Sequence, residues 1–263
     1  MNSHFPLDTL LQIAIAAGEK ILEIYRSDFA VTHKDDDTPL TQADLAVHRH
    51  IVTALGKLSP TLPVLSEESA AIPYAERSRW TRYWLVDPLD GTKEFIKRNG
   101  EFTVNIALIE NHRPVLGVVH APELNESYVA AKTEGAFCCN AGTRQRLQVR
   151  KLPVRPKFLL SRSHRDDALD RALKFAPPFD SIGIGSSLKF CRIAEGAADL
   201  YLRTGPTSEW DTAAGQCILE AAGGAVWKLP QITPLACNEK ESLLNPSFAA
   251  IGDTKADWDW LTK

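Results

Sequence analysis

This chain of 263 residues lacks long apolar runs, cysteines at CxxC spacing and an excess of basic residues. No apolar run approaches the roughly 20 residues that a bilayer-spanning helix needs, so no transmembrane segment is expected. The five cysteines include no CxxC pair, and no signal peptide is apparent, which together predict a reduced, cytoplasmic setting. A formal net charge of −3 argues against a binder of nucleic-acid polymers, which needs a basic surface.

The chain has the composition and patterning of a globular protein with a substantial core. Helical spacing of apolar residues predicts an amphipathic helix over residues 7–27, and a second helix opens at Thr41. Residues 102–149 are typical of successive antiparallel strands, the last of them at Arg146–Val149, and strands alternate with helices after residue 157. Two prolines and several bases in Lys151–Pro156 indicate a domain boundary, giving domains 1–153 and 154–263.

The most informative stretch joins a predicted buried strand at Arg82–Val86 to a pair of carboxylates. Asp87 and Asp90 stand three residues apart at the exit of this strand, which Pro88 is expected to end because proline has no N–H for the ladder. Carboxylates of this kind bind hard divalent cations. An ordinary Asp-Gly turn is the alternative explanation of the same residues.

A turn and a helix start follow the two carboxylates. Gly91 permits a sharp turn, and Thr92 is a natural N-cap for a helix that runs to Lys97. Backbone amides at such a place bind phosphate. Acids and amides directed at one point indicate metal-assisted phosphoryl chemistry.

Three further carboxylates stand at the ends of predicted elements. Glu67 follows a short strand, and Asp44 lies in the first turn of the helix that opens at Thr41. Asp211 lies at the start of a helix predicted over Glu209–Ala221. Each has an ordinary alternative: Glu67 as a solvated acid, Asp44 as the partner of Thr41 in a capping box, and Asp211 as a stabiliser of the helix dipole. Their similar placement favours a common site.

Small residues in the segment 183–187 precede a helix that carries Lys189, an arrangement that predicts an anion cradle. Arg203 follows a predicted strand over residues 199–202. Lys189 and Arg203 would complement a second phosphate, which a monophosphate substrate lacks.

Taken together, three motifs resemble the inositol monophosphatase superfamily of Mg²⁺-dependent, lithium-sensitive phosphatases. The motifs are Ser66-Glu67-Glu68, Asp87-Pro88-Leu89-Asp90-Gly91-Thr92 and Trp210-Asp211-x-Ala-x-Gly215, and the resemblance covers nearly the whole chain. Within the superfamily, the segments 93–98, 161–164 and 185–190 look most like the bacterial CysQ type of 3′(2′),5′-bisphosphate nucleotidase.

The resemblance implies a layered αβαβα sandwich of the sugar-phosphatase type, with an antiparallel sheet and most metal ligands in the first domain. It implies two or three Mg²⁺ ions held by Glu67, Asp87, the Leu89 carbonyl, Asp90 and Asp211. It also implies a catalytic set of Asp44, Thr92 and Glu67, in which Asp44 and Thr92 orient and deprotonate the attacking water. The substrate-binding set would be Glu67, Leu89, Asp90, Gly91, Thr92, Ser161, His164, Gly185, Lys189, Arg203 and Asp211.

The implied reaction converts adenosine 3′,5′-bisphosphate, a small-molecule nucleotide, to AMP and phosphate. This reaction disposes of a by-product of sulfate assimilation, and 3′-phosphoadenylyl sulfate is a further candidate substrate. An inositol or sugar monophosphatase of the same superfamily is the nearest alternative, and a non-catalytic nucleotide sensor is a second. Monomer and homodimer both stay open, as does peripheral association with the cytoplasmic face of the inner membrane.

Overall fold

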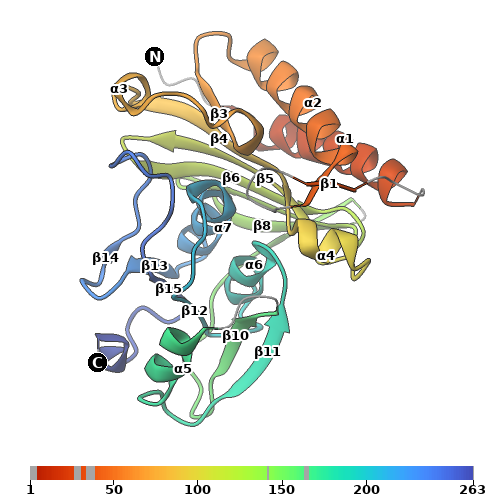
Figure 1. Cartoon of the computed structure of the whole chain (residues 1–263). Coiled ribbons are helices and arrows are strands. Elements are labelled where there is room, and N and C mark those ends of the chain that lie inside the picture. Colours follow the sequence, from red (N-terminus) through yellow and green to blue (C-terminus); the bar gives the residue numbers. More distant parts are fainter. Residues whose placement is uncertain (1–4, 27–30, 34–38, 141, 163–165, 263) are drawn as a thin grey trace.

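The computed structural model describes residues 5–26, 31–33, 39–140, 142–162 and 166–262. Within these ranges the chain forms two large β-sheets, with helices outside and between them (Figure 1). A small third sheet pairs β1 (Val31–His33) with β2 (Pro39–Thr41) in antiparallel orientation. No helix in the described part of the chain is long and apolar enough to cross a membrane.

The first large sheet has seven strands in the order β3-β4-β5-β6-β7-β8-β9. Neighbouring strands are antiparallel, except that β3 runs parallel to β4. The strands are β3 (Val64–Ser66), β4 (Arg82–Asp90), β5 (Thr103–Glu110), β6 (Arg113–Ala121), β7 (Glu126–Ala131), β8 (Gly135–Asn140) and β9 (Thr143–Arg146). The predicted antiparallel meander is therefore confirmed, and its strand order follows the chain.

The strand predicted at Arg146–Val149 lies earlier, at β9, because the hairpin register pairs Asn140 with Thr143. All four residues of β9 are exposed, so no apolar alternation marks this strand in the sequence.

Helices α1 (Leu7–Tyr25) and α2 (Gln42–Leu58) cover the outer face of this sheet (Figure 1). The apolar stripe of α1, including Leu10, Ala14 and Ile21, is fully buried and packs in one cluster with Trp84 of β4. The amphipathic helix predicted over residues 7–27 is confirmed, ending at Tyr25.

The second large sheet has six strands in the order β11-β10-β12-β15-β13-β14. Strands β10, β11 and β12 are parallel, while β13, β14 and β15 join in antiparallel orientation. The strands are β10 (Lys157–Ser161), β11 (Asp180–Ile184), β12 (Leu200–Arg203), β13 (Ala225–Lys228), β14 (Thr233–Pro234) and β15 (Phe248–Ile251).

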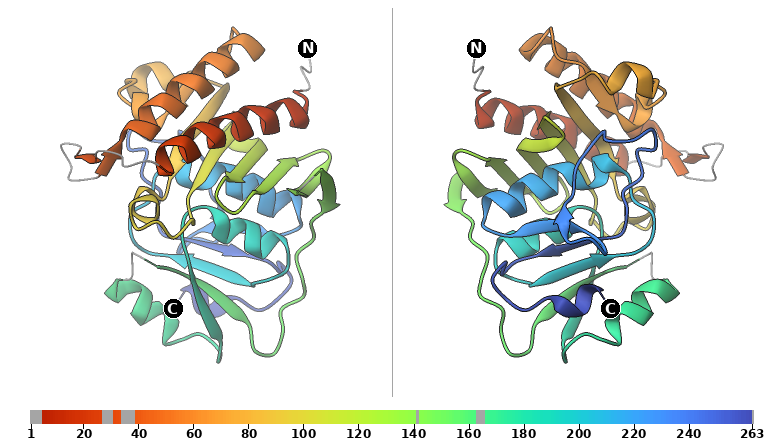
Figure 2. Two further views of the ribbon diagram at one scale, coloured as in Figure 1. Left: turned by 90° about the vertical axis from the view of Figure 1, so that its right-hand side faces the viewer. Right: turned by 90° about the vertical axis from the view of Figure 1, so that its left-hand side faces the viewer.

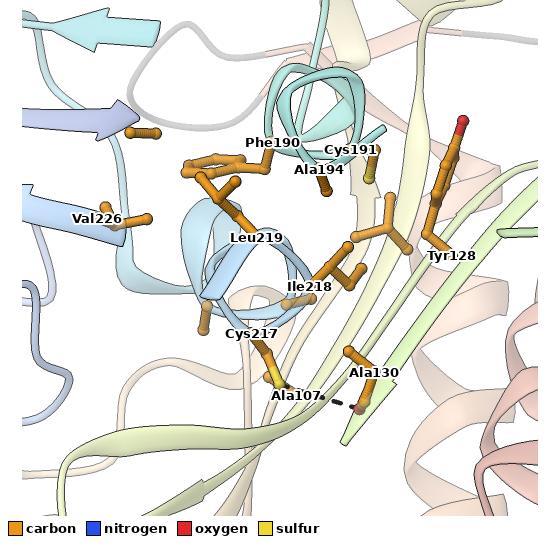
Figure 3. Packing of buried hydrophobic residues seen from close by; sticks show 14 of the residues in the cluster. Ala107, Tyr128, Ala130, Phe190, Cys191, Ala194, Cys217, Ile218, Leu219 and Val226 are labelled. Carbon is orange, nitrogen blue, oxygen red and sulfur yellow. Dashed lines mark hydrogen bonds between the residues drawn. The ribbon is translucent and has the colours of Figure 1, made fainter. Parts of the chain in front are cut away.

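Helices α6 (Leu188–Ala194) and α7 (Glu209–Ala221) form the layer between the two sheets, as the side views show (Figure 2). Phe190 of α6 and Leu219 of α7 belong to one buried cluster that also includes Ala107 from the first sheet and Val226 from the second (Figure 3). Because both sheets bury their inner faces against the same two helices, this core fixes their relative position.

Helix α5 (Asp167–Leu173) and the 3₁₀ turn η2 (Asp259–Thr262) cover the outer face of the second sheet. The order of layers is therefore helix, sheet, helix, sheet, helix, which confirms the predicted αβαβα sandwich. The division into domains 1–153 and 154–263 stays a prediction. Helix α7 from the second part packs against β5 and β6 of the first.

Pro88 does not end β4, contrary to the prediction from the sequence. The strand continues to Asp90, and its pairing with β5 shifts register between Asp87 and Asp90. Pro88 lies inside this bulge, where no ladder hydrogen bond is required of its nitrogen. The bulge brings the carboxylates of Asp87 and Asp90 close together at the end of β4.

The helix expected after the carboxylates is the short α4 (Thr92–Ile96), and its N-cap is Gly91 rather than Thr92. Gly91 has φ of 90°, in the left-handed region that glycine occupies without strain. Two other short helical segments, the 3₁₀ turn η1 (Glu67–Ser69) and α3 (Tyr74–Arg77), connect β3 to β4.

His120 of β6 gives the fold a testable pH dependence. Its Nδ1 lies 2.9 Å from Ser127 Oγ, and burial lowers the pKa of His120 to about 4, opposed in part by a hydrogen bond with the Glu126 backbone. In the unfolded chain His120 therefore binds a proton near pH 6.5, whereas in the folded chain it does so only near pH 4. We expect His120 to remove about 3 kcal/mol of stability as the pH falls through this window.

The measurement is urea unfolding at pH 7.5 and pH 5 for the wild-type protein and for His120→Asn, which keeps a polar group toward Ser127. The variant should lose less stability between the two pH values. An equal loss in both proteins would show that His120 is not responsible.

Candidate active site

A cavity of about 700 Å³ lies where the end of β4, the start of α4, the turn after β11 and the start of α7 meet. Most residues predicted for the site line it. These are Glu67, Asp87, Leu89, Asp90, Gly91, Thr92, Ser161, Gly185, Lys189, Arg203 and Asp211. The bulge in β4 and the layered packing thus bring together residues that are far apart in the sequence.

Two predicted residues differ from this set. Asp44 is buried in the first turn of α2 and is not among the residues that line the cavity, although its charge helps to raise the pKa of Asp87. The capping-box alternative for Asp44 involves the Thr41 side chain, which lies outside the described side chains. His164 lies outside the described residues.

Three carboxylates form the centre of the site. Oxygen atoms of Asp87, Asp90 and Asp211 lie within 4.8 Å of one another. Burial raises the pKa of Asp87 well above its usual range, and the nearby charge of Glu67 adds to this. Burial likewise raises the pKa of Asp90 to about 6. Such a cluster is costly as three bare anions, because each charge is desolvated and repelled by its neighbours.

Hydrogen bonds hold Asp90 in one orientation. Its Oδ2 accepts from the Ser187 amide at 2.6 Å, and from Thr103 Oγ1 and Asn105 Nδ2 at 3.4 Å each. Ser187 Oγ in turn donates to Asn105 Oδ1 at 2.7 Å. The three bonds to Asp90 all engage its Oδ2, so Oδ1 is the oxygen that they leave for a further ligand.

Asp211 serves two purposes at the start of α7. Its Oδ2 accepts from the Ser208 amide at 2.9 Å, completing a capping box with the Ser208 side chain. The structure thus shows Asp211 both in a capping box and in the acidic cluster, and its predicted effect on the helix dipole stays a prediction. A capped first turn fixes the residue without consuming all of its acceptor capacity.

The turn between β4 and α4 is held by local hydrogen bonds. The Leu89 amide donates to Asp87 Oδ1 at 3.1 Å, and Thr92 Oγ1 donates to the Leu89 carbonyl at 3.4 Å. Leu89 and Thr92 therefore stand together at the cavity wall.

Lys189 and Arg203 supply positive charge in the same cavity. Lys189 Nζ donates to the carbonyls of Ile184 at 3.1 Å and Ser186 at 2.6 Å. Burial lowers the pKa of Lys189 to about 8, against the opposing influence of the Asp90 charge. The Arg203 guanidinium donates to the Pro206 carbonyl at 2.7 Å.

The predicted anion cradle before α6 binds the protein's own carboxylates. The Gly185 amide donates to Glu101 Oε2 at 2.8 Å, and the Ser187 amide donates to Asp90. The turn therefore acts first as a support for Asp90, and Lys189 satisfies its carbonyls.

The sequence prediction missed the residues that support Asp90. Thr103 and Asn105 are fully buried polar residues on the same face of β5, whose other residues before Glu110 are apolar. The available signal in the sequence was the two polar residues at alternate positions of an apolar strand, which indicates that one face of this strand contacts polar groups. This part of β5 pairs with the end of β4. Ser186 lies in the predicted anion cradle but was not among the predicted site residues. It lines the cavity with φ of 43°, and its buried Oγ has no hydrogen-bond partner among the described residues.

The donor set fits a hard divalent cation. Oxygen ligands from several carboxylates converge on one cavity, and Glu67 and the Leu89 residue line the same space. A divalent cation would offset both the burial of these acids, which is the main cause of their raised pKa values, and the repulsion between their charges. No sulfur or imidazole ligand is among the clustered groups in the described ranges, which favours an oxygen-binding metal.

Comparison with known proteins agrees with the layered αβαβα fold and with a metal site at the acidic cluster. The sequence profile of the inositol monophosphatase family matches residues 6–249. The chain therefore belongs to the inositol monophosphatase family, whose enzymes are metal-dependent.

Two relatives carry a more specific name. The 3′(2′),5′-bisphosphate nucleotidase CysQ of Salmonella typhimurium is 50% identical over 246 residues, which cover 92% of this chain and 98% of the relative. The crystal structure of CysQ from Bacteroides thetaiotaomicron, 40% identical, gives a TM-score of 0.84 and covers 95% of this chain and 99% of its own.

A more distant structure shares the fold. Inositol monophosphatase from Anabaena is 24% identical, with a TM-score of 0.75, and the match covers 97% of this chain and 93% of that one. At this identity the likeness supports the architecture alone.

Proposed function

We propose that this chain is a Mg²⁺-dependent 3′(2′),5′-bisphosphate nucleotidase that converts adenosine 3′,5′-bisphosphate to AMP and phosphate, with 3′-phosphoadenylyl sulfate as a further substrate. One observation carries the proposal: three clustered carboxylates share a cavity with Lys189 and Arg203. The two CysQ relatives support the choice of substrate.

The acidic and the basic residues of the cavity suit the two phosphates of this substrate. Glu67, Asp87, Asp90, Asp211 and the Leu89 carbonyl would hold two or three Mg²⁺ ions beside the 3′-phosphate. Lys189 and Arg203 would attract the 5′-phosphate, because both positively charged side chains line the cavity. Ser161, His164 and Gly185 would contact the remainder of the nucleotide.

In the reaction, the bound cations would supply the positive charge that offsets the negative charge developing on the phosphoryl oxygens. The chain's own residues position the water. Thr92, whose hydroxyl already lies at the Leu89 carbonyl, would orient the water toward phosphorus. Asp44 would accept the proton, and Glu67 would complete the catalytic set. The amides of Gly91 and Thr92 would hold the phosphate that leaves.

The direct test is phosphate release from adenosine 3′,5′-bisphosphate with Mg²⁺, without Mg²⁺, and with Mg²⁺ plus Li⁺. We expect rapid release that requires Mg²⁺ and is inhibited by Li⁺. AMP should be the nucleotide product, identified by chromatography.

Inositol 1-phosphate is the comparison substrate in the same assay. Turnover equal to or better than that of the nucleotide would overturn the substrate assignment while preserving the chemistry. Absence of turnover for both, with Mg²⁺-dependent binding of the nucleotide, would identify a sensor instead.

A further inference from the structure

Glu101 lies in the loop between α4 and β5, outside the residues that line the cavity, and contacts the segments that form its wall. Its Oε2 accepts from the Gly185 amide at 2.8 Å, directly after β11. The same carboxylate pairs with Arg162, directly after β10, through bonds of 3.0 Å from Nε to Oε2 and 2.7 Å from Nη2 to Oε1. One carboxylate thus links the ends of two neighbouring parallel strands.

The geometry of the Arg162 pair is bidentate, which fixes direction as well as distance. Arg162 Nη2 also donates to the Gly183 carbonyl at 2.7 Å, so the guanidinium spans β11 and Glu101 together. Most exposed ion pairs contribute little to stability. This pair is therefore better explained by placement of the two strand ends than by stabilisation of the fold.

The backbone of Glu101 is also packed tightly between two glycines of the cavity wall. A Cβ on Gly185 would stand 2.8 Å from the Glu101 carbonyl oxygen, and a Cβ on Gly91 would stand 3.1 Å from the same atom. Glu101 therefore touches the turn that begins α4 and the turn that precedes α6. These turns belong to opposite halves of the chain.

The placement of Gly185 matters because the turn that it begins carries two groups of the site. Ser187, two residues later, donates its amide to Asp90, and Lys189 donates to the carbonyls of Ile184 and Ser186. A shift of Gly185 would move the charged end of Lys189 and loosen one support of Asp90.

We propose that Glu101 is a positioning residue that, with Arg162, holds the Gly185–Ser187 turn and the end of β10 in the arrangement that receives the second phosphate of the substrate. The substrate part of this inference rests on the proposed nucleotidase function. The part that concerns the turn does not.

Electrostatics alone makes the opposite prediction. Glu101 is an anion near a cavity proposed to bind an anionic nucleotide, so its removal would lower the KM if charge were its main effect. If positioning is its main effect, removal raises the KM. The sign of the change therefore separates the two explanations.

The test compares Glu101→Ala, Glu101→Gln and the control Asp180→Ala. Asp180 is the first residue of β11, at the end of the strand away from the cavity. Its carboxylate pairs with Arg155 at 2.8 Å. Glutamine keeps an oxygen for the Gly185 amide and loses the charge that faces Arg162. Kinetics with adenosine 3′,5′-bisphosphate and with p-nitrophenyl phosphate, which has no second phosphate, are combined with amide hydrogen exchange of the free protein.

For Glu101→Ala we expect a KM for the nucleotide about ten-fold higher, a kcat within about two-fold of wild type, and little change with p-nitrophenyl phosphate. Amide exchange over residues 184–189 should be faster. Glu101→Gln should fall between wild type and Glu101→Ala, and Asp180→Ala should match wild type.

A lower KM in Glu101→Ala, or unchanged exchange over residues 184–189, would overturn the proposal. So would an equal loss with both substrates, since that outcome indicates general destabilisation. A wild-type protein that does not hydrolyse the nucleotide would refute the proposed function instead, and the exchange measurement would still decide whether Glu101 holds the turn.

Discussion

Asp90→Asn is expected to lower phosphate release by roughly 10³-fold while the protein remains folded. Three donors engage Asp90 Oδ2, from Ser187, Thr103 and Asn105. In the variant the amide oxygen would take this position, because an NH₂ group there would face three donors. The NH₂ group would then point to where a cation ligand is needed.

The fold should tolerate this change because the substitution removes one of three mutually repelling carboxylates. Without added metal, the melting temperature of Asp90→Asn should equal or exceed that of wild type. Asp8→Asn is the matched control, since Asp8 is exposed and pairs only with Arg144 among the described residues. Near wild-type phosphate release by Asp90→Asn would contradict the metal-dependent mechanism.

The acidic part of the site was predictable because its residues are close together in the sequence or stand at the ends of recognisable elements. Asp87 and Asp90 stand at the end of an apolar strand. Asp211 lies in the first turn of a helix whose bounds, Glu209–Ala221, the sequence delimits correctly. Local patterns of this kind indicate where strands and helices begin and end. The three motifs together indicated the family. The roles assigned to individual residues stay predictions.

The supports of that site were not predictable in the same way. Glu101 meets Arg162 and Gly185 across 61 and 84 residues of chain. Nothing local marks Glu101, because an acid before an apolar strand is ordinarily a solvated residue. Such pairings become visible only when the order of the strands is known.

The strand containing Pro88 shows why a correct local rule gave a wrong boundary. Proline does remove a ladder hydrogen bond, but the register shift between Asp87 and Asp90 creates a place where none is needed. The strand therefore resumes for Asp90 to pair with Thr103. A bulge depends on the partner strand, which the sequence of β4 alone does not contain.

Gly117→Ala is expected to have the largest effect on stability, about 3 kcal/mol of destabilisation, because it forces two layers of the core apart. A Cβ on Gly117 of β6 would stand 2.6 Å from the backbone oxygen of Ala214 and 2.9 Å from Cys217 Cβ, both on α7. A backbone atom in a packed helix cannot rotate away as a side chain can. Helix α7 must therefore move as a body.

Gly56→Ala is the matched control, because nothing stands within 4 Å of a Cβ at Gly56, in the last turn of α2. Alanine there should stabilise the protein by up to about 1 kcal/mol through its higher helix propensity. Urea unfolding at a single pH measures both variants. Changes of the same sign would contradict the close packing of β6 on α7.

Gly117→Ala also links the packing of the core to the site, because helix α7, which packs against Gly117, carries Asp211 in its first turn. Displacement of α7 should move Asp211 relative to Asp87 and Asp90, which are held by β4 and by the Ser187 amide. We therefore expect folded Gly117→Ala to require more Mg²⁺ for half-maximal phosphate release than Gly56→Ala. An identical Mg²⁺ requirement in the two variants would show that the acidic cluster is insensitive to the position of α7.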